Sequence, residues 1–228
     1  MTENQEHQPE SERTEPSIAQ PTNAGTDLTE IDDPLSQCEA VILTPEERKV
    51  LIETALEHKT TGNTHFKNKD YASALSSYQE ALAVCPEDSS AERAVFYANI
   101  AACYIHMEDY KKAVENCSEA LKCTPNYSKA LLRRASANSR IGSWSSLTDS
   151  LADYKKILEL EPGNKEALAA TRTLPGRIEV QQEKEKNEMM GKLKDLGNSF
   201  LGNFGLSLDS FQMNQDPKSG GYSINMKK

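Results

Sequence analysis

Five polar side chains have types and spacings that suit the binding of carboxylates. Lys59 and Asn63 are four residues apart, and so are Lys129 and Arg133, so each pair would share one face of a helix. Asn99 lies 36 residues after Asn63 and 34 before Arg133. Lys supplies a point charge, Arg can hold a carboxylate through two N–H groups, and Asn can donate to a carboxylate while also reading a peptide amide. Together they would suit a chain-terminal carboxylate and an aspartate side chain.

The chain around these residues repeats itself, and this repetition could bring them together. Residues from Ala55 onward align with those from Ala94 onward, pairing Gly62 with Ala101, Ala74 with Ala113, Tyr78 with Cys117, Ala81 with Ala120 and Pro86 with Pro125. A third copy spans 128–162, with three extra residues around 143–148 that we expect in the loop between its two helices. Small residues let helices approach and a proline ends each unit, so every copy predicts a helical hairpin.

The helices of the first copy can be placed from the pattern. Segments 55–69 and 71–84 are predicted helices, and Leu75, Tyr78 and Leu82 would share a packing face. The run 44–47 reads as a capping box with proline at the first helical position, so the first helix should begin near residue 45. Stacked hairpins line a concave groove with their first helices, and we expect the five polar residues to converge there.

A known repeat matches this pattern. Gly62-Asn63, Lys69-Asp70-Tyr71, Ala74-Leu75, Tyr78, Ala81-Leu82 and Pro86 resemble the tetratricopeptide repeat consensus. The resemblance implies an all-α fold, a short right-handed solenoid over residues 45–162 with repeats at about 55–88, 94–127 and 128–164. It also equates Lys59, Asn63, Asn99, Lys129 and Arg133 with the carboxylate clamp that holds the Glu-Glu-Val-Asp tail of heat-shock proteins 70 and 90. The implied function is that of a non-catalytic co-chaperone adaptor.

The C-terminal part has signals of its own. Residues 165–203 are predicted to form a helix, interrupted at 174–176, that either caps the solenoid or binds a second partner. Alternating side chains on both sides of 216–221 predict a small hairpin within 204–228. Segments 191–198, 204–207 and 221–225 resemble the C-terminal signature of the tetratricopeptide repeat protein 1 family.

The acidity of the chain is confined to its N-terminal segment. Residues 1–46 hold eleven acidic residues against Arg13 alone, a charge of −10, whereas the whole chain carries −9. The remainder is therefore close to neutral, at +1. With few aliphatic residues, the segment cannot bury enough apolar surface to offset its chain entropy, so residues 1–44 are predicted to be a disordered acidic tail.

Several classes of protein are disfavoured. The five cysteines lack the spacing of zinc ligands. The sequence also has no secretory signal and no long apolar run. We therefore expect a cytoplasmic monomer that does not insert into membranes, with the nucleus as the alternative location. The sequence has no glycine-rich phosphate-binding loop. His106 and Glu108 have the His-x-Glu spacing of zinc deaminases but lack the paired cysteines of that site. We therefore expect no metal, cofactor or catalysis. Lysines interleaved with acids at 183–195 argue against nucleic-acid binding.

Two other functions stay open. One is a signalling or complex-assembly scaffold, which would bind internal segments of its partners through the groove or the C-terminal helix. The other is an enzyme whose catalytic residues the sequence does not reveal. Binding that requires a free terminal carboxylate would separate the chaperone adaptor from the scaffold.

Overall fold

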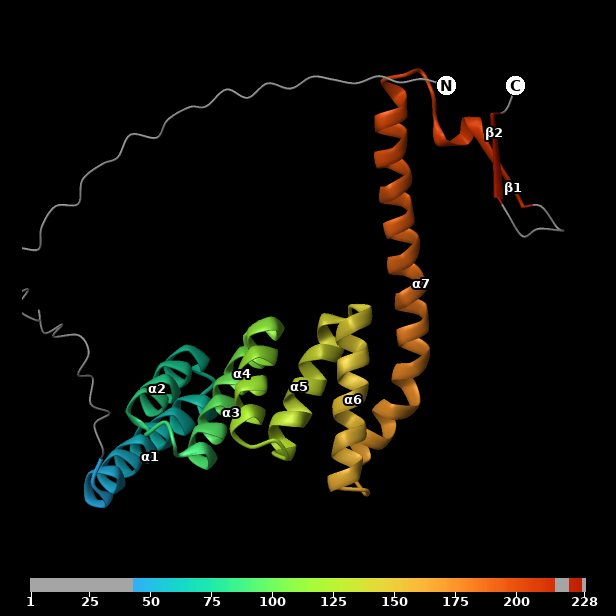
Figure 1. Ribbon diagram of the computed structural model, residues 1–228. Helices are drawn as coiled ribbons and strands as arrows, with labels where there is room; N and C mark the ends of the chain where they lie inside the picture. Colours follow the sequence, from blue (N-terminus) through green and yellow to red (C-terminus); the bar gives the residue numbers. More distant parts are fainter. Residues whose placement is uncertain (1–42, 216–221, 227–228) are drawn as a thin grey trace, which may run out of the picture. The chain divides into compact units, whose positions relative to one another are not determined.

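The computed structural model describes residues 43–215 and 222–226. Their helices and strands follow in chain order (Figure 1): α1 (Pro45–Lys67), α2 (Tyr71–Val84), α3 (Ser90–His106), α4 (Tyr110–Cys123), α5 (Ser128–Ile141), α6 (Trp144–Leu160), α7 (Lys165–Gly202), the 3-10 helix η1 (Leu208–Ser210), β1 (Phe211–Gln215) and β2 (Tyr222–Met226). The predicted disordered tail and Cys38 lie outside the described residues, apart from positions 43 and 44.

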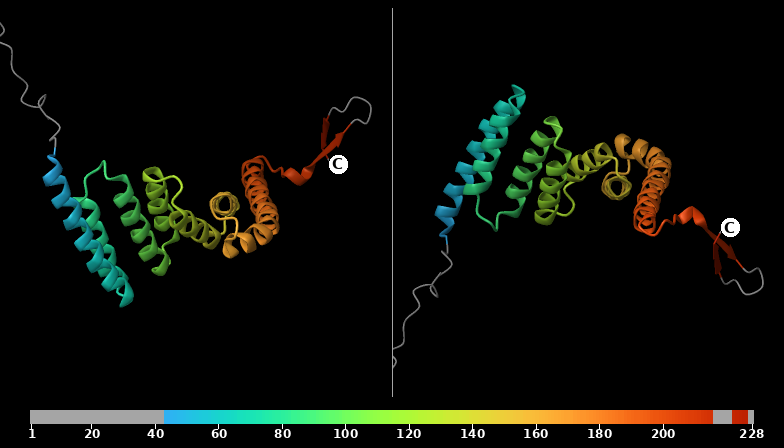
Figure 2. Two further views of the ribbon diagram at one scale, coloured as in Figure 1. Left: turned by 90° about the horizontal axis from the view of Figure 1, so that it is seen from below. Right: turned by 90° about the horizontal axis from the view of Figure 1, so that it is seen from above.

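Six of the helices form three hairpins that stack in chain order, as the repeats predicted (Figure 2). Each helix packs against the next, from α1 on α2 through to α6 on α7. In addition, α3 touches both α1 and α5, so the first helices of the three hairpins are neighbours. The predicted all-α solenoid is therefore confirmed.

Small residues set the distance between the helices. Gly62, Ala74, Ala101 and Ala113 are buried, as the pairing of repeat positions required. A Cβ added at Gly62 would lie 2.8 Å from Cε1 of Tyr78, so only glycine lets the Tyr78 ring pack this closely on α1.

The ends of the helices follow the local sequence. Thr44 caps α1 through the predicted capping box, with Pro45 as the first helical residue, so this prediction is confirmed. Asp70 and Asp109 begin α2 and α4 by accepting from the backbone N–H groups of Ser73 and Lys112. These caps fix where each second helix starts.

The third hairpin differs from the sequence-based prediction. Helix α6 has 17 residues, whereas α2 and α4 have 14 each, and only Gly142 and Ser143 separate α5 from α6. The three extra residues therefore lengthen the helix, and the prediction that they lengthen the loop is wrong. Gly142 ends α5 with a φ of 74°, and Ser143 Oγ accepts from the N–H of Ser146, so the turn closes in two residues.

Helix α7 runs unbroken through Pro175, so the predicted interruption is also wrong. Proline leaves the carbonyl of Thr171 without its helical donor, and the helix bends in its N-terminal third instead of ending (Figures 1 and 2). Buried Ala167 and Leu174, before Pro175, and partly buried Ile178, after it, pack with the core of the third hairpin, so α7 is held near α6 on both sides of the proline. None of the described helices is long and apolar enough to span a membrane.

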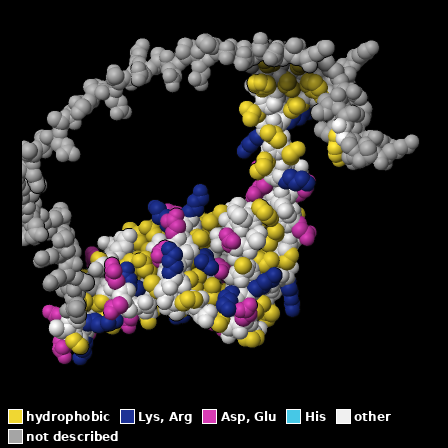
Figure 3. Space-filling view, viewed as in Figure 1, with side chains coloured by type: hydrophobic (Ala, Val, Ile, Leu, Met, Phe, Trp, Pro, Cys, Tyr) yellow, Lys and Arg dark blue, Asp and Glu magenta, His cyan; other side chains and the backbone are white. Residues whose placement is uncertain are grey.

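The distal half of α7 carries exposed apolar side chains, which Figure 3 shows gathered toward its end. Five of them are 58–71% exposed: Met189, Met190, Leu193, Leu196 and Phe200. The helix was predicted either to cap the solenoid or to bind a second partner. Its proximal part packs on the solenoid, as a cap would, and its distal part presents an apolar surface on which a partner could pack.

A two-stranded antiparallel hairpin follows α7. Phe211 pairs with Met226 and Gln215 with Tyr222, and the connecting residues 216–221 lie outside the described part. The segment before β1 is tied to α7, since Asn198 Oδ1 accepts a 2.7 Å hydrogen bond from the N–H of Leu208. The side chain of Leu208 covers Gly197, where a Cβ would lie 2.7 Å from its Cδ1. Gly197 and Asn198 of the C-terminal signature thus dock η1.

Candidate peptide-binding groove

The five predicted site residues all lie on the first helices of the three hairpins. Lys59 and Asn63 are on α1, Asn99 is on α3, and Lys129 and Arg133 are on α5. Since α3 contacts the other two helices, these residues belong to one row of neighbouring helices. Lys129 is exposed and the other four are partly exposed.

Asn63 is held by a tyrosine from the second helix of its own hairpin. The hydroxyl of Tyr78 donates a 2.7 Å hydrogen bond to Asn63 Oδ1. Burial raises the pKa of Tyr78 to about 12, so at neutral pH the phenol keeps the proton that it donates. The bond occupies the amide oxygen and leaves the NH₂ group of Asn63 as a donor for a ligand. The sequence identified Tyr78 only as a packing residue.

Arg133 links the third hairpin to the second. Its Nη1 donates a 2.6 Å hydrogen bond to the backbone oxygen of Ala98, the residue before Asn99. Burial raises the pKa of Tyr78, and the Arg133 charge opposes this effect, so the guanidinium interacts electrostatically with the Tyr78 hydroxyl. Arg133 thus serves partly as a structural link, and its other N–H groups remain as donors.

Lys59, Asn99 and Lys129 keep their polar groups uncommitted. Within the described part of the chain, their side chains make no hydrogen bond or ion pair that would compete with a ligand. The Tyr78 hydroxyl holds Asn63, and Arg133 is bonded to the backbone just before Asn99. Lys59 lies one helical turn before Asn63, and Lys129 one turn before Arg133, so each lysine shares a face with the site residue that follows it.

A cavity of about 380 Å³ adjoins Arg133 and opens along the first helices. We call it the inner groove; its lining comes from α1, α3, α5 and α7 and comprises Phe66, Ala102, Ile105, His106, Leu132, Arg133, Ser136 and Glu166. Most of these side chains are apolar or aromatic, so the groove offers a surface for aliphatic side chains next to a cation.

One wall of the inner groove is aromatic. His106 stacks on Tyr71 with ring centres 4.6 Å apart and planes 7° apart, and the Phe66 ring meets both edge-on, at 5.2 Å and 5.4 Å. At the α7 end of the groove, Glu166 Oε1 accepts from the Tyr154 hydroxyl at 3.0 Å. No signal in the sequence assigns these residues to the site, because their positions depend on how the hairpins stack.

Comparison with known proteins agrees with the repeats. The family model of the tetratricopeptide repeat matches residues 53–126. Residues 53–126 are thus similar to tetratricopeptide repeats. The mitochondrial import receptor subunit TOM70 of Saccharomyces cerevisiae is 47% identical over 88 residues, which are 39% of this chain and 13% of the receptor. The chain thus matches a small part of the length of this relative.

Solved structures are similar to more than half of the chain. The tetratricopeptide domain of Arabidopsis OM64 is 29% identical with a TM-score of 0.50, covering 56% of this chain and 99% of that domain. The myosin chaperone UNC-45 from C. elegans, whose crystal structure is a complex with an Hsp90 peptide, is 28% identical with a TM-score of 0.50. That match covers 65% of this chain and 16% of UNC-45.

Proposed function

We propose that this protein is a non-catalytic, cytoplasmic co-chaperone adaptor that holds the C-terminal Glu-Glu-Val-Asp tail of heat-shock protein 70 and/or 90. The observation that carries the proposal is the Tyr78–Asn63 hydrogen bond beside Arg133, which fixes an amide donor next to a guanidinium. Lys59 and Lys129, which have no ion-pair partner in the described part of the chain, add positive charge at both ends. The C-terminal signature supports placement in the tetratricopeptide repeat protein 1 family.

Each proposed ligand contact has a chemical role. The NH₂ groups of Asn63 and Asn99 and the Lys59 ammonium would donate to the terminal carboxylate, while Lys129 and the free N–H groups of Arg133 would hold an aspartate side chain. The apolar inner groove would receive the aliphatic residue before the terminus. Charge-assisted hydrogen bonds contribute about 1.5–3 kcal/mol each. After the loss of peptide entropy, we expect micromolar affinity, about −8 kcal/mol.

The similarity to UNC-45 supports this proposal, because that protein was crystallised with an Hsp90 peptide. The similarity covers 65% of this chain. The residue assignments rest on the resemblance to the carboxylate clamp and on the placement of all five residues on the first helices of the hairpins.

A titration tests the proposal directly. Isothermal titration calorimetry would compare a peptide ending in Glu-Glu-Val-Asp with its C-amidated twin. We expect amidation to weaken binding at least tenfold, and Lys129→Ala with Arg133→Ala to abolish measurable binding. Lys155→Ala is the matched control, since this exposed lysine lies on α6. Equal affinity for the two peptides would refute the proposal.

The second candidate function is a signalling or assembly scaffold, and the exposed apolar face of distal α7 favours it. A partner that packs on this face would be indifferent to a free peptide terminus. Replacing Leu193 and Phe200 by Lys would then release the partner while leaving the Glu-Glu-Val-Asp peptide bound. The two functions can therefore be tested separately in one protein.

A further inference from the structure

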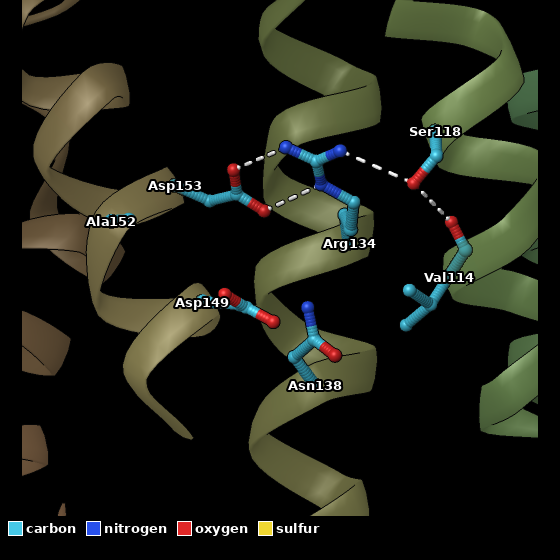
Figure 4. Close-up of a pocket in the computed structure, with 7 residues that line it drawn as sticks. All are labelled: Val114, Ser118, Arg134, Asn138, Asp149, Ala152 and Asp153. Carbon is cyan, nitrogen blue, oxygen red and sulfur yellow. Dashed lines mark hydrogen bonds and ion pairs between the residues drawn. The ribbon is translucent and has the colours of Figure 1, made fainter. Parts of the chain in front are cut away.

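A second cavity lies between α4, α5 and α6, on a different face of α5 from the inner groove. Adjacent residues on α5 point to different sites, because Arg133 reaches α3 whereas Arg134 reaches α4 and α6. The cavity holds about 280 Å³ and is lined by Val114 and Ser118 of α4, Arg134 and Asn138 of α5, and Asp149 and Asp153 of α6 (Figure 4). We call it the α4–α6 pocket.

One side of the pocket is a closed ion-pair network. Arg134 holds Asp153 bidentately, with Nε at 2.8 Å from Oδ2 and Nη2 at 2.7 Å from Oδ1. Its Nη1 donates to Ser118 Oγ at 3.2 Å, and that hydroxyl donates to the Val114 carbonyl at 2.8 Å. Asp153 is only 5% exposed. The arginine charge is therefore neutralised within the protein, and this side of the pocket is rigid.

Two polar groups on the other side make no hydrogen bond or ion pair within the described residues, although the Asp149 charge helps to raise the pKa of Arg134. Asn138 is 4% exposed, yet its side-chain amide makes no hydrogen bond within the described residues. Asp149 is exposed, and in the same part of the chain its carboxylate makes no hydrogen bond or ion pair. Figure 4 shows both side chains directed toward the same space beside Arg134 and Asp153. Because no fully buried side-chain N or O atom in the described part of the chain lacks a hydrogen-bond partner, the Asn138 amide must still be reached by solvent through the pocket, so a ligand could replace that water.

These groups indicate a ligand that donates hydrogen bonds and carries positive charge. Arg134 cancels one of the two carboxylates, so the pocket has a net charge of −1, supplied by Asp149, and would repel an anion. No three metal-ligating residues come together anywhere in the part of the chain that the structure describes, and a single free carboxylate is a poor cation site. The volume is also below the roughly 300–1,000 Å³ of small-molecule and cofactor pockets.

We propose that the α4–α6 pocket binds a lysine or arginine side chain from a basic segment of a partner protein. The ammonium or guanidinium pairs with Asp149. The Asn138 nitrogen faces Asp149 in Figure 4, so the amide turns about its terminal side-chain bond to let Oδ1 accept from the ligand, while Val114 and Ala152 contact the methylene groups of the ligand side chain. The protein thus has two recognition sites of opposite charge preference, a cationic site on the first helices and an anionic pocket between α4 and α6. The second site does not depend on the first.

Nuclear magnetic resonance of the ¹⁵N-labelled full chain provides the test, because the Asn138 side-chain amide reports directly on the pocket. The probes are the blocked peptides acetyl-Ala-Lys-Ala-amide, acetyl-Ala-Arg-Ala-amide and acetyl-Ala-Gln-Ala-amide, which have no terminal carboxylate for the inner groove. We expect the lysine peptide, the arginine peptide or both to shift the Asn138 NH₂ resonances saturably, and the glutamine peptide to leave them in place.

Variants of the chain decide the assignment. Asp149→Asn should weaken binding of the basic peptide at least tenfold, because it removes the charge while keeping the side-chain shape. Glu179→Gln is the matched control on an exposed part of α7, and Lys129→Ala with Arg133→Ala should leave this binding unchanged. Absence of a shift with either basic peptide, an equal shift with the glutamine peptide, or unchanged binding in Asp149→Asn would overturn the proposal.

Discussion

The hydroxyl of Tyr78 donates a 2.7 Å hydrogen bond to Oδ1 of Asn63, which joins the core of the first hairpin to the proposed peptide site. Tyr78 is only 2% exposed, so its ring is fixed by packing. The position of the Asn63 amide is therefore set before a ligand arrives, which reduces the entropy lost on binding.

Tyr78→Phe should weaken binding of the Glu-Glu-Val-Asp peptide about three- to tenfold, because the Asn63 amide can then rotate and present its oxygen to the carboxylate. Calorimetry against the wild-type chain measures this change. Tyr127→Phe serves as the control, because this residue lies just before α5 and its hydroxyl makes no hydrogen bond within the described residues. Equal affinity in Tyr78→Phe would mean that Asn63 needs no fixed orientation.

Gly62→Ala should destabilise the chain by about 1–3 kcal/mol, because the new Cβ would meet the Tyr78 ring at 2.8 Å and a buried ring has little room to move. It should also reduce peptide binding, since displacing the Tyr78 ring moves the hydroxyl that donates to Asn63. Urea unfolding followed by circular dichroism gives the free energy of unfolding.

Gly176→Ala is the matched control for this substitution. No atom lies within 4 Å of a Cβ added there, and the residue is helical, so alanine should stabilise the chain by up to about 1 kcal/mol. If both glycine variants changed stability in the same direction, the steric role assigned to Gly62 would be wrong.

Asp153→Ala should cost about 3 kcal/mol of unfolding free energy, because it leaves the partly buried Arg134 without its bidentate partner in the third hairpin. Asp149→Ala removes a carboxylate from the same helix and the same pocket, but this one is exposed, so we expect a change of less than about 0.5 kcal/mol. Thermal and urea unfolding of the two variants in parallel would show the difference. Similar losses would contradict the structural role of the Arg134–Asp153 pair.

Much of the fold was predictable because it depends on local chemistry. The capping box at Thr44 places the start of α1, and buried small residues at Gly62 and Ala101 mark where the helices of a hairpin cross. The five site residues could be found in the same way, since positions on successive first helices recur at nearly constant spacing. Their convergence on one ligand remains a prediction.

Other features depend on competition between local and tertiary effects. Pro175 favours the end of a helix, but packing of Leu174 and Ala167 in the third hairpin keeps α7 continuous. The Tyr78–Asn63 bond joins residues 15 apart, and Arg134 and Asp153 are 19 apart on different helices. In the sequence, an arginine within a helix looks like a solvated surface group, so nothing marks it as the centre of a buried network.

Acid should weaken the starts of the second helices. Hydrogen bonds from Ser73 lower the pKa of Asp70, and hydrogen bonds from Lys112 lower the pKa of Asp109. A carboxylate whose pKa is lower in the folded chain than in the unfolded chain stabilises the fold fully at pH values above the unfolded pKa, near 3.8. This stabilisation is lost as the pH falls through the pKa of the folded chain. The double variant Asp70→Asn, Asp109→Asn retains a capping side chain without the titration. Urea unfolding between pH 2 and pH 6 gives the free energy of unfolding of both chains. On acidification, the double variant should lose less of this free energy than the wild type. Parallel curves would show that these two caps do not contribute to acid sensitivity.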